Sequence, residues 1–463
     1  MITIQLYIHK VKKSTVIVAF FEKNKIIAMI TMDFSCLSGY NNIRNFGGKE
    51  FEISMELYKR EKYLKKIRPF YDACDLIKVI SGVRRCGKSS LMEIIADEIS
   101  ETGVKDENII YIDLDSRAYN KIKTADKLDK LIDSKLKGNG VHYLFIDEVQ
   151  NVKGFEEVLN GFRTDGGVSI FITGSNSYML SGELVTKLTG RYIEFEVYTL
   201  SFEEYVHMKE FYHKAINSNL MIELNQYILE GGFPRTVQIE EMAAKRTYVD
   251  EVVREIFEKD IRRRVKIKDI ASFEIVRNFI INNFGSTTSI NSLHQALRKN
   301  GIAIGRSTVS RYIQILVDAK ILYECNRFDM KSKRALSGEK KYYLADLSFY
   351  FALNTDNRIN YGLTLENMVY FYARSMDYAV SVGRIGKLEC DFILRDKELN
   401  YSYIQVAYTI ALSKETEERE YRVLESIRDN YNKYIVTTDY LLQKRNGIEH
   451  VNIMDYMMRE EKF

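Results

Sequence analysis

One stretch of this sequence, Gly82-Val83-Arg84-Arg85-Cys86-Gly87-Lys88-Ser89, fits the pattern GxxxxGK[ST] and decides the fold. Glycines let such a loop turn tightly, so that successive backbone N–H groups point at phosphate oxygens. The helix that follows directs its positive N-terminal end at the same anion. We expect Lys88 to reach the β- and γ-phosphates and Ser89 to offer its hydroxyl to Mg²⁺. The residues from Gly82 to Ser90 therefore predict a site for nucleotide phosphates.

The sequence around this loop alternates between strand and helix patterns. A short apolar run at 76–81 precedes the loop, and 90–100 has apolar residues at helical spacing. Further compact apolar runs lie at 109–114, 143–146 and 168–173. Near-continuous apolar strands that alternate with helices are typical of a parallel sheet covered on both faces. The sequence therefore predicts an α/β core.

Acidic residues end one of these strands, as nucleotide hydrolysis requires. The run 143–146 is followed by Asp147 and Glu148. We expect Asp147 to hold the Mg²⁺ shell and Glu148 to orient and polarise the attacking water. A strand capped by acidic loop residues is the alternative. Together with the loop, this pattern predicts NTP binding and hydrolysis.

Polar residues after the next strand are candidates for sensing the γ-phosphate. Ser175 or Asn176 follows the strand at 168–173, although turn chemistry alone also favours Gly-Ser-Asn there. Arg191 is the candidate arginine for stabilising charge on the leaving phosphate, in its own subunit or in a neighbour. A surface salt bridge is the alternative for Arg191.

Several motifs follow one another at distances that resemble one family. They lie at 77–89, 143–148, 188–191, 200–205, 231–234 and 365–367. Together they resemble the bacterial and archaeal AAA-family ATPases that end in a domain of unknown function numbered 4143, over about residues 55–463. The resemblance implies ATP as the nucleotide and a cytoplasmic protein. It also implies that Pro234, in a Gly-x-Pro element, lies near the adenine; a plain helix breaker is the alternative.

A basic segment follows the ATPase part. Residues 261–341 contain 17 Lys and Arg against 6 Asp and Glu, whereas the whole chain has a net charge of +4. Helical patterns at 273–284, 289–299 and 307–319 and strand patterns at 321–328 and 341–344 predict a winged helix-turn-helix. Its candidate DNA contacts are Arg298, Lys299, Arg306 and Arg311. A packing module that relays nucleotide state is the alternative.

The last part of the chain resembles the restriction-endonuclease-like fold. Glu366 is expected on a helix, Asp391 on a strand and Gln405 on the next strand. In that fold two acids bind Mg²⁺, and a lysine two residues after the second acid activates water. Here that lysine is replaced by Ala407, so we expect a degenerate nuclease with little or no cleavage. Lys387 or Lys414 could take over the role of the lysine.

Composition limits the remaining possibilities. The chain has 463 residues, of which 46% are apolar and 12% aromatic, which argues against disorder. No apolar run approaches the ~20 residues of a membrane-spanning helix. Five scattered cysteines without a CxxC pair favour a reducing cytoplasm. Cys86 lies at a helix N-terminus that would lower the pKa of its thiol, although a filler role is the alternative.

These patterns predict five parts: an extension at 1–54, a P-loop AAA-type core at 55–200, a helical lid at 201–262, a winged helix at 263–345 and a nuclease-like domain at 346–463. The extension is either an accessory hairpin or untranslated sequence before a true start at Met55. We expect an ATPase that uses ATP and Mg²⁺ to move the later modules, with double-stranded DNA, a protein partner and an oligomer as possible associates. The alternatives are a slowly hydrolysing switch acting on a protein and an ATP-dependent nuclease.

Overall fold

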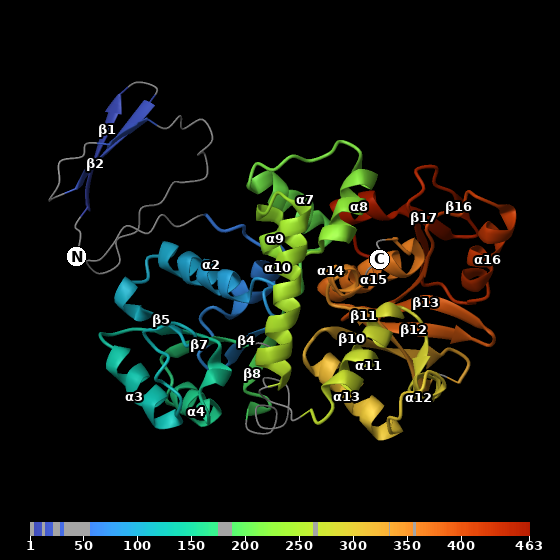
Figure 1. The fold of residues 1–463 in the computed structure, drawn as a ribbon, viewed down its shortest axis with the longest axis horizontal. Coiled ribbons are helices and arrows are strands. Elements are labelled where there is room, and N and C mark those ends of the chain that lie inside the picture. The colour runs from blue at the N-terminus through green and yellow to red at the C-terminus, as the bar shows by residue number, and fades with distance from the viewer. Residues whose placement is uncertain are drawn as a thin grey trace. The chain divides into compact units, whose positions relative to one another are not determined.

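The computed structural model describes residues 4–11, 14–21, 28–31, 56–174, 188–262, 267–332, 334–354 and 358–463 (Figure 1). The chain divides into two units, Met1–Tyr58 and Lys59–Phe463. The first unit contains the strands β1 (Ile4–Val11), β2 (Ser14–Phe21) and β3 (Ala28–Thr31), which pair in that order as an antiparallel sheet. All elements below belong to the second unit.

The phosphate-loop part is built on a five-stranded parallel sheet. Its strands are β4 (Ile77–Ser81), β5 (Ile109–Asp113), β6 (His142–Asp147), β7 (Val168–Thr173) and β8 (Tyr192–Glu196). Their order across the sheet is β5-β6-β7-β4-β8, and every neighbouring pair is parallel. The carboxyl ends of β4 and β6 therefore lie at one edge, and the predicted α/β parallel sheet is confirmed.

Helices cover both faces of this sheet. α2 (Lys88–Glu101) lies on one face, and α3 (Ala125–Lys135) and α4 (Phe155–Asp165) lie on the other (Figure 1). The strands are buried on both sides because alternate side chains meet different helices: Val79 packs in the cluster that contains Leu128 and Leu159. Burial of both faces explains the near-continuous apolar strands of the sequence.

A helical segment follows the sheet. It consists of α7 (Phe202–Phe211), α8 (Leu220–Glu230), α9 (Pro234–Gln238), α10 (Met242–Glu255) and the π-helix η5 (Ile256–Arg262). Ser201 and Glu204 form a capping box that starts α7. Before the sheet, α1 (Glu61–Ile67) continues into a short 3₁₀ turn, η2 (Arg68–Phe70). The predicted mostly helical segment is confirmed.

Three helices and a hairpin occupy the basic segment. The helices are α11 (Ile270–Asn282), α12 (Ile290–Lys299) and α13 (Arg306–Asp318); the hairpin is β10 (Leu322–Asp329) with β11 (Arg334–Leu344). The short strand β9 (Thr288–Ser289) pairs with β11. The elements match the predicted ones within a few residues, except that β11 begins before residue 341.

The hairpin also belongs to the sheet of the last part, because β10 pairs in parallel with β12 (Ala379–Ile385). The sheet continues through β13 (Leu388–Arg395), β14 (Tyr401–Val406), β15 (Asn432–Thr437), β17 (Ile448–Asn452) and β16 (Lys444–Arg445). The sequence patterns predicted two separate parts, because the pairing of β10 with a strand about 50 residues later leaves no local signal.

Four helices accompany this mixed sheet: α14 (Ser348–Leu353), α15 (Tyr361–Ser375), α16 (Lys414–Glu425) and α17 (Ile453–Met458). The sequence pattern predicts a helix at 415–430; in the structure α16 ends at Glu425, and α17 is not predicted by the pattern. Within the described part of the chain, no helix has the length and apolar content needed to cross a bilayer.

Candidate functional site

The loop Gly82–Ser89 follows β4 directly and opens α2. Gly82 has φ +144°, and a Cβ atom there would lie 2.1 Å from the backbone oxygen of Val197. Gly87 has φ +101° at the N-terminus of α2. No residue with a side chain fits at Gly82, because both the close approach and the backbone angle exclude it. The glycines of the motif are therefore required by the geometry of the loop itself.

The Lys88 side chain folds back against the beginning of the loop to which it belongs. Its side chain is buried, and Nζ donates hydrogen bonds of 3.1 Å to the backbone oxygens of Gly82 and Val83. Ser89 and Ser90, in the first turn of α2, are half-buried. This arrangement brings an ammonium group and a helix N-terminus to one concave loop, which is the chemistry of a phosphate site.

The acidic pair lies at the same edge of the sheet. Asp147 is the last residue of β6, and its Oδ1 accepts hydrogen bonds from the Glu148 backbone at 3.1 Å and from the Thr173 hydroxyl. Glu148 has φ +53° and begins the turn after the strand. Thr173 ends the neighbouring strand β7, and its role was missed. The order of the strands, which the sequence does not reveal, makes Thr173 the partner of Asp147.

The electrostatics of Glu148 suit a proton acceptor. Burial raises the pKa of its carboxyl above the ordinary value of 4.5, while the charges of Lys88 and Arg84 oppose that rise. Glu148 thus lies within electrostatic reach of the loop lysine. The Oε1 atom of Glu148 lies 3.8 Å from Nη1 of Arg84, another residue of the loop.

Three further predicted nucleotide contacts lie at the loop. A Cβ atom added to Gly87 would lie 3.6 Å from Cγ of Pro234, so the Gly-x-Pro element packs against the loop. Arg84 is buried and Arg85 is exposed, and both pair with acids of the helical segment. The loop is therefore bordered by α9, by the end of α10 and by η5.

The surroundings of Cys86 suit the filler role and not a reactive thiol. Its side chain is fully buried and its thiol donates to the backbone oxygen of Val197 over 3.2 Å. Burial raises the pKa of Cys86 and outweighs the nearby Lys88 and Arg60 charges. The expected lowering of this pKa is wrong, because the side chain turns into the protein and away from solvent.

Arg191 does not reach the site of its own subunit. The Ile77 backbone N–H donates to the Arg191 carbonyl over 3.0 Å, which places Arg191 beside the start of β4. The loop begins at the other end of this strand, roughly 15 Å away at about 3.3 Å per residue. A role for Arg191 within one subunit is therefore wrong, and a role on a neighbour stays a prediction. Ser175 and Asn176 lie outside the described residues.

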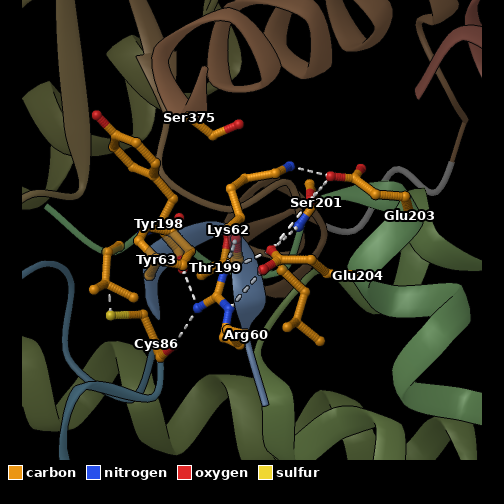
Figure 2. A network of polar contacts seen from close by, with 12 residues as sticks. Arg60, Lys62, Tyr63, Cys86, Tyr198, Thr199, Ser201, Glu203, Glu204 and Ser375 are labelled. Carbon is orange, nitrogen blue, oxygen red and sulfur yellow. Dashed lines mark hydrogen bonds and ion pairs between the residues drawn. The ribbon is translucent and has the colours of Figure 1, made fainter. Parts of the chain in front are cut away.

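A buried arginine ties the loop to the helical segment. Arg60, before α1, donates to both carboxylate oxygens of Glu204, over 2.8 Å and 2.6 Å, and to the Cys86 carbonyl over 3.0 Å (Figure 2). It also donates to the Tyr198 carbonyl over 2.8 Å. Burial alone would raise the pKa of Glu204, but Arg60 holds it below its ordinary range. Beside this pair, Lys62 bonds Glu203 (Figure 2).

Three of the family-like motifs meet next to Arg60. The backbone of Leu200 donates to the Gly232 carbonyl over 2.7 Å, and the Gly232 N–H donates to Asp346 over 2.8 Å. Asn367 bonds both the N–H and the carbonyl of Leu344. The motifs at 200–205, 231–234 and 365–367 thus form one junction between the phosphate-loop part and the last sheet.

The candidate DNA contacts lie on the surface of α12 and α13. Arg298, Lys299, Arg306 and Arg311 are all exposed. Val309 and Ile313 of α13 are buried, so the apolar face of the helix packs inward and leaves the basic face outside.

The carboxylates of the last part form a buried cluster that contains a lysine the sequence did not indicate. Lys341 of β11 donates to Glu366 over 2.8 Å and lies 3.1 Å from Glu389. Burial raises the pKa of Asp391, and Glu366 adds to the rise. Asp391 accepts from the Val406 N–H over 2.8 Å. Neither Lys387 nor Lys414 is the lysine found here.

Among the described residues, no group of three or more His, Cys, Asp and Glu side chains is arranged to hold a metal. The buried Oε1 of Gln405 has no hydrogen-bond partner. The ammonium group of Lys341 lies 2.8 Å from Glu366, the residue that the resemblance would make a metal ligand.

The chain matches two families of domains. Residues 75–206 match the AAA domain, and residues 221–359 match a domain of unknown function, DUF8612. An uncharacterized protein of Haemophilus influenzae is 33% identical over 410 residues, which cover 88% of this chain and 100% of that protein. An uncharacterized protein of Methanocaldococcus jannaschii is 30% identical over 419 residues, covering 87% and 90%. The AAA part of the family resemblance is confirmed; the part concerning domain 4143 is not.

Two solved structures have a low similarity to this chain. The ORC1 protein of Aeropyrum pernix in complex with DNA has a TM-score of 0.31 and 14% identity, covering 65% of this chain and 93% of that one. AMPPCP-bound DnaA of Aquifex aeolicus has a TM-score of 0.28 and 15% identity, covering 56% and 87%.

Proposed function

We propose that this chain, which belongs to the family of AAA-domain proteins that includes the Haemophilus influenzae and Methanocaldococcus jannaschii relatives, binds and hydrolyses ATP with Mg²⁺. The observation that carries the proposal is the juxtaposition of the Lys88 ammonium, the N-terminus of α2 and the carboxylate of Glu148 at one edge of the parallel sheet. A triphosphate needs the first two features for binding, and in-line attack by water needs the third.

The residues have separate roles in this reaction. The N–H groups of the loop 82–89 and the Lys88 ammonium hold the β- and γ-phosphates. The hydroxyl of Ser89 and the carboxylate of Asp147 are hard oxygen donors, the kind that Mg²⁺ prefers, and would hold the ion against the phosphates. Glu148 orients water and accepts its proton. Pro234 contacts the nucleotide beside the loop, and Ser175 or Asn176 would sense the γ-phosphate.

The later modules are the proposed output of ATP turnover. The boundaries proposed from sequence (55–200, 201–262, 263–345 and 346–463) assign α11–α13 with the β10–β11 hairpin to a winged helix. Its exposed Arg298, Lys299, Arg306 and Arg311 suit the phosphate backbone of duplex DNA. The last part is proposed to be nuclease-like without cleavage activity, since Lys341 already neutralises Glu366.

The test is Mg²⁺-dependent ATP hydrolysis by the full chain, with and without duplex DNA and with Lys88→Ala as background. We expect turnover that DNA stimulates and that Lys88→Ala removes. Turnover indifferent to DNA would replace DNA by a protein partner. Tight binding without turnover would favour a switch, and nicking of a plasmid would favour a nuclease. Equal ATP binding by Lys88→Ala and wild type would overturn the proposal.

The raised pKa of Glu148 predicts the acid limb of the pH profile. Only the ionised carboxylate accepts a proton from water, so turnover falls as pH decreases through the pKa of Glu148. Because burial raises that pKa, the fall is expected at a pH above the ordinary 4.5 of a glutamate. Steady-state rates at saturating ATP, measured in buffers of constant ionic strength, locate the midpoint. A rate that stays flat down to pH 4.5 would contradict this role.

A further inference from the structure

Arg84, inside the phosphate loop, is held by an acid from the helical segment. Its Nε and Nη2 donate to the two carboxylate oxygens of Asp260, each over 2.9 Å. The Asp260 side chain is completely buried and that of Arg84 is 9% exposed. A buried bidentate pair of this kind is strong and directional. It joins the loop to a residue 176 positions later in the chain.

The third nitrogen of the Arg84 guanidinium, Nη1, faces two carboxylates at the catalytic side of the site. Its Nη1 lies 3.8 Å from Oε1 of Glu148 and 3.8 Å from Oε1 of Glu255. Glu148 is the group proposed to act on the water that attacks the γ-phosphorus. A guanidinium beside Glu148 therefore lies on the γ-phosphate side of the loop, where an arginine stabilises developing charge.

Asp260 belongs to an unusual element. η5 (Ile256–Arg262) is a π-helix, a rare form that is frequently found at functional sites. η5 continues α10, and α11, the first helix of the proposed winged helix, begins at Ile270. Few residues separate η5 from α11 in the sequence. A displacement of Asp260 would therefore act on a segment that lies close in the chain to the basic module.

Carboxylate and phosphate compete for the same arginine donors. A guanidinium presents a planar fork that binds either anion through two hydrogen bonds. A bound γ-phosphate would add negative charge next to Asp260 and Glu255, which repel it, and next to Arg84, which attracts it. The exchange of one anion for the other would break the Arg84–Asp260 pair and loosen η5.

We propose that Arg84 binds the γ-phosphate of ATP and exchanges Asp260 for it, so that the Arg84–Asp260 pair reports nucleotide state to η5 and α11. The proposal rests on the proposed ATP site. It assigns to Arg84, within one subunit, the charge-stabilising role that the sequence suggested for Arg191. A static pair, by contrast, would only hold the loop to the lid.

The sign of the change in affinity separates exchange from a static pair. Mg²⁺ with ATP or ADP is titrated into the full chain, catalysis being prevented by low temperature and short mixing times. We expect Asp260→Asn to bind ATP roughly 10-fold more tightly, because Arg84 is released, and Arg84→Gln to bind it roughly 10-fold more weakly, within the usual range of binding couplings. ADP lacks the γ-phosphate, so its affinity is expected to change much less in both variants.

The matched control is Glu223→Gln, which leaves buried Lys209 of the same helical segment without its ionic partner, away from the loop. It is expected to lower the melting temperature without changing the ratio of ATP to ADP affinity. Hydrogen exchange of 256–262 in the wild type is expected to increase on addition of Mg²⁺ and AMP-PCP, and not in Arg84→Gln.

Equal weakening of ATP and ADP by both variants would show a static pair and overturn the exchange. If Lys88→Ala loses ATP while the two variants keep the wild-type ratio, only the exchange fails. If Lys88→Ala binds ATP like the wild type, the proposed ATP site itself fails.

Discussion

Glu148→Gln is expected to reduce ATP hydrolysis by at least about 100-fold while leaving ATP binding intact, since a positioned general base contributes ~10²–10⁴-fold. The amide keeps the shape of the side chain and can still accept the hydrogen bond that Gln150 donates to Oε2. What it loses is the ability to take a proton from water. Phosphate release under saturating ATP measures the first effect, and equilibrium binding of Mg·ATP measures the second.

Stability helps to interpret this variant. Burial raises the pKa of Glu148, so above its unfolded pKa the ionised carboxylate costs the folded state free energy. Removal of that charge in Glu148→Gln should therefore leave the melting temperature at neutral pH unchanged or higher. Loss of turnover then cannot be attributed to unfolding.

The control for Glu148→Gln is another acid at the same edge. Asp115 is exposed after β5 and its Oδ1 accepts a hydrogen bond from Asn151 over 2.8 Å. Asp115→Asn removes a negative charge near Glu148 without touching the proposed proton acceptor, so its turnover is expected to stay within a few-fold of wild type. Should Glu148→Gln retain more than a tenth of the wild-type rate, another group must activate the water.

The phosphate site was predictable because its chemistry is local in sequence. The glycines of the loop 82–89 set the path of its backbone, and Lys88 supplies the positive charge of the site. Asp147 and Glu148 directly follow an apolar run. Each of these features needs only a few consecutive residues and the strand–loop–helix pattern around them. The helices of the basic segment were predictable for the same reason, since spacing of apolar residues is a local signal.

Partners distant in sequence were not predictable. Asp260 and Arg84 are 176 positions apart, and Glu204 and Arg60 are 144 apart. Lys341 of β11 and Glu366 of α15 are 25 positions apart, and the packing of a helix against a sheet leaves no trace in composition. The same reason explains why the sequence could not place Arg191: its position depends on β8 pairing beside β4.

Arg60→Met is expected to lower the free energy of unfolding of the second unit by about 3–5 kcal/mol, the usual cost of breaking a buried ion pair by removing one partner. Both side chains of the pair are about 5% exposed, so Glu204 would be left charged and desolvated. Urea unfolding followed by fluorescence of the tyrosines measures the effect. As a control, Arg68→Met removes a more exposed arginine, bonded to Glu61 and Glu98, and is expected to cost no more than about 1 kcal/mol.

The double variant Arg60→Met/Glu204→Met separates charge from position. Removing both charges relieves the desolvation penalty, so part of the lost stability should return. Arg60→Met is also expected to lower ATP affinity, because the Cys86 carbonyl loses the Arg60 donor that holds the phosphate loop. The double variant lacks the same donor, so its ATP affinity should stay low. Restoration of stability with ATP affinity still reduced would make Arg60 a positioning residue for the loop. Recovery of both together would show that the arginine serves stability alone, and that the loop keeps its shape without it.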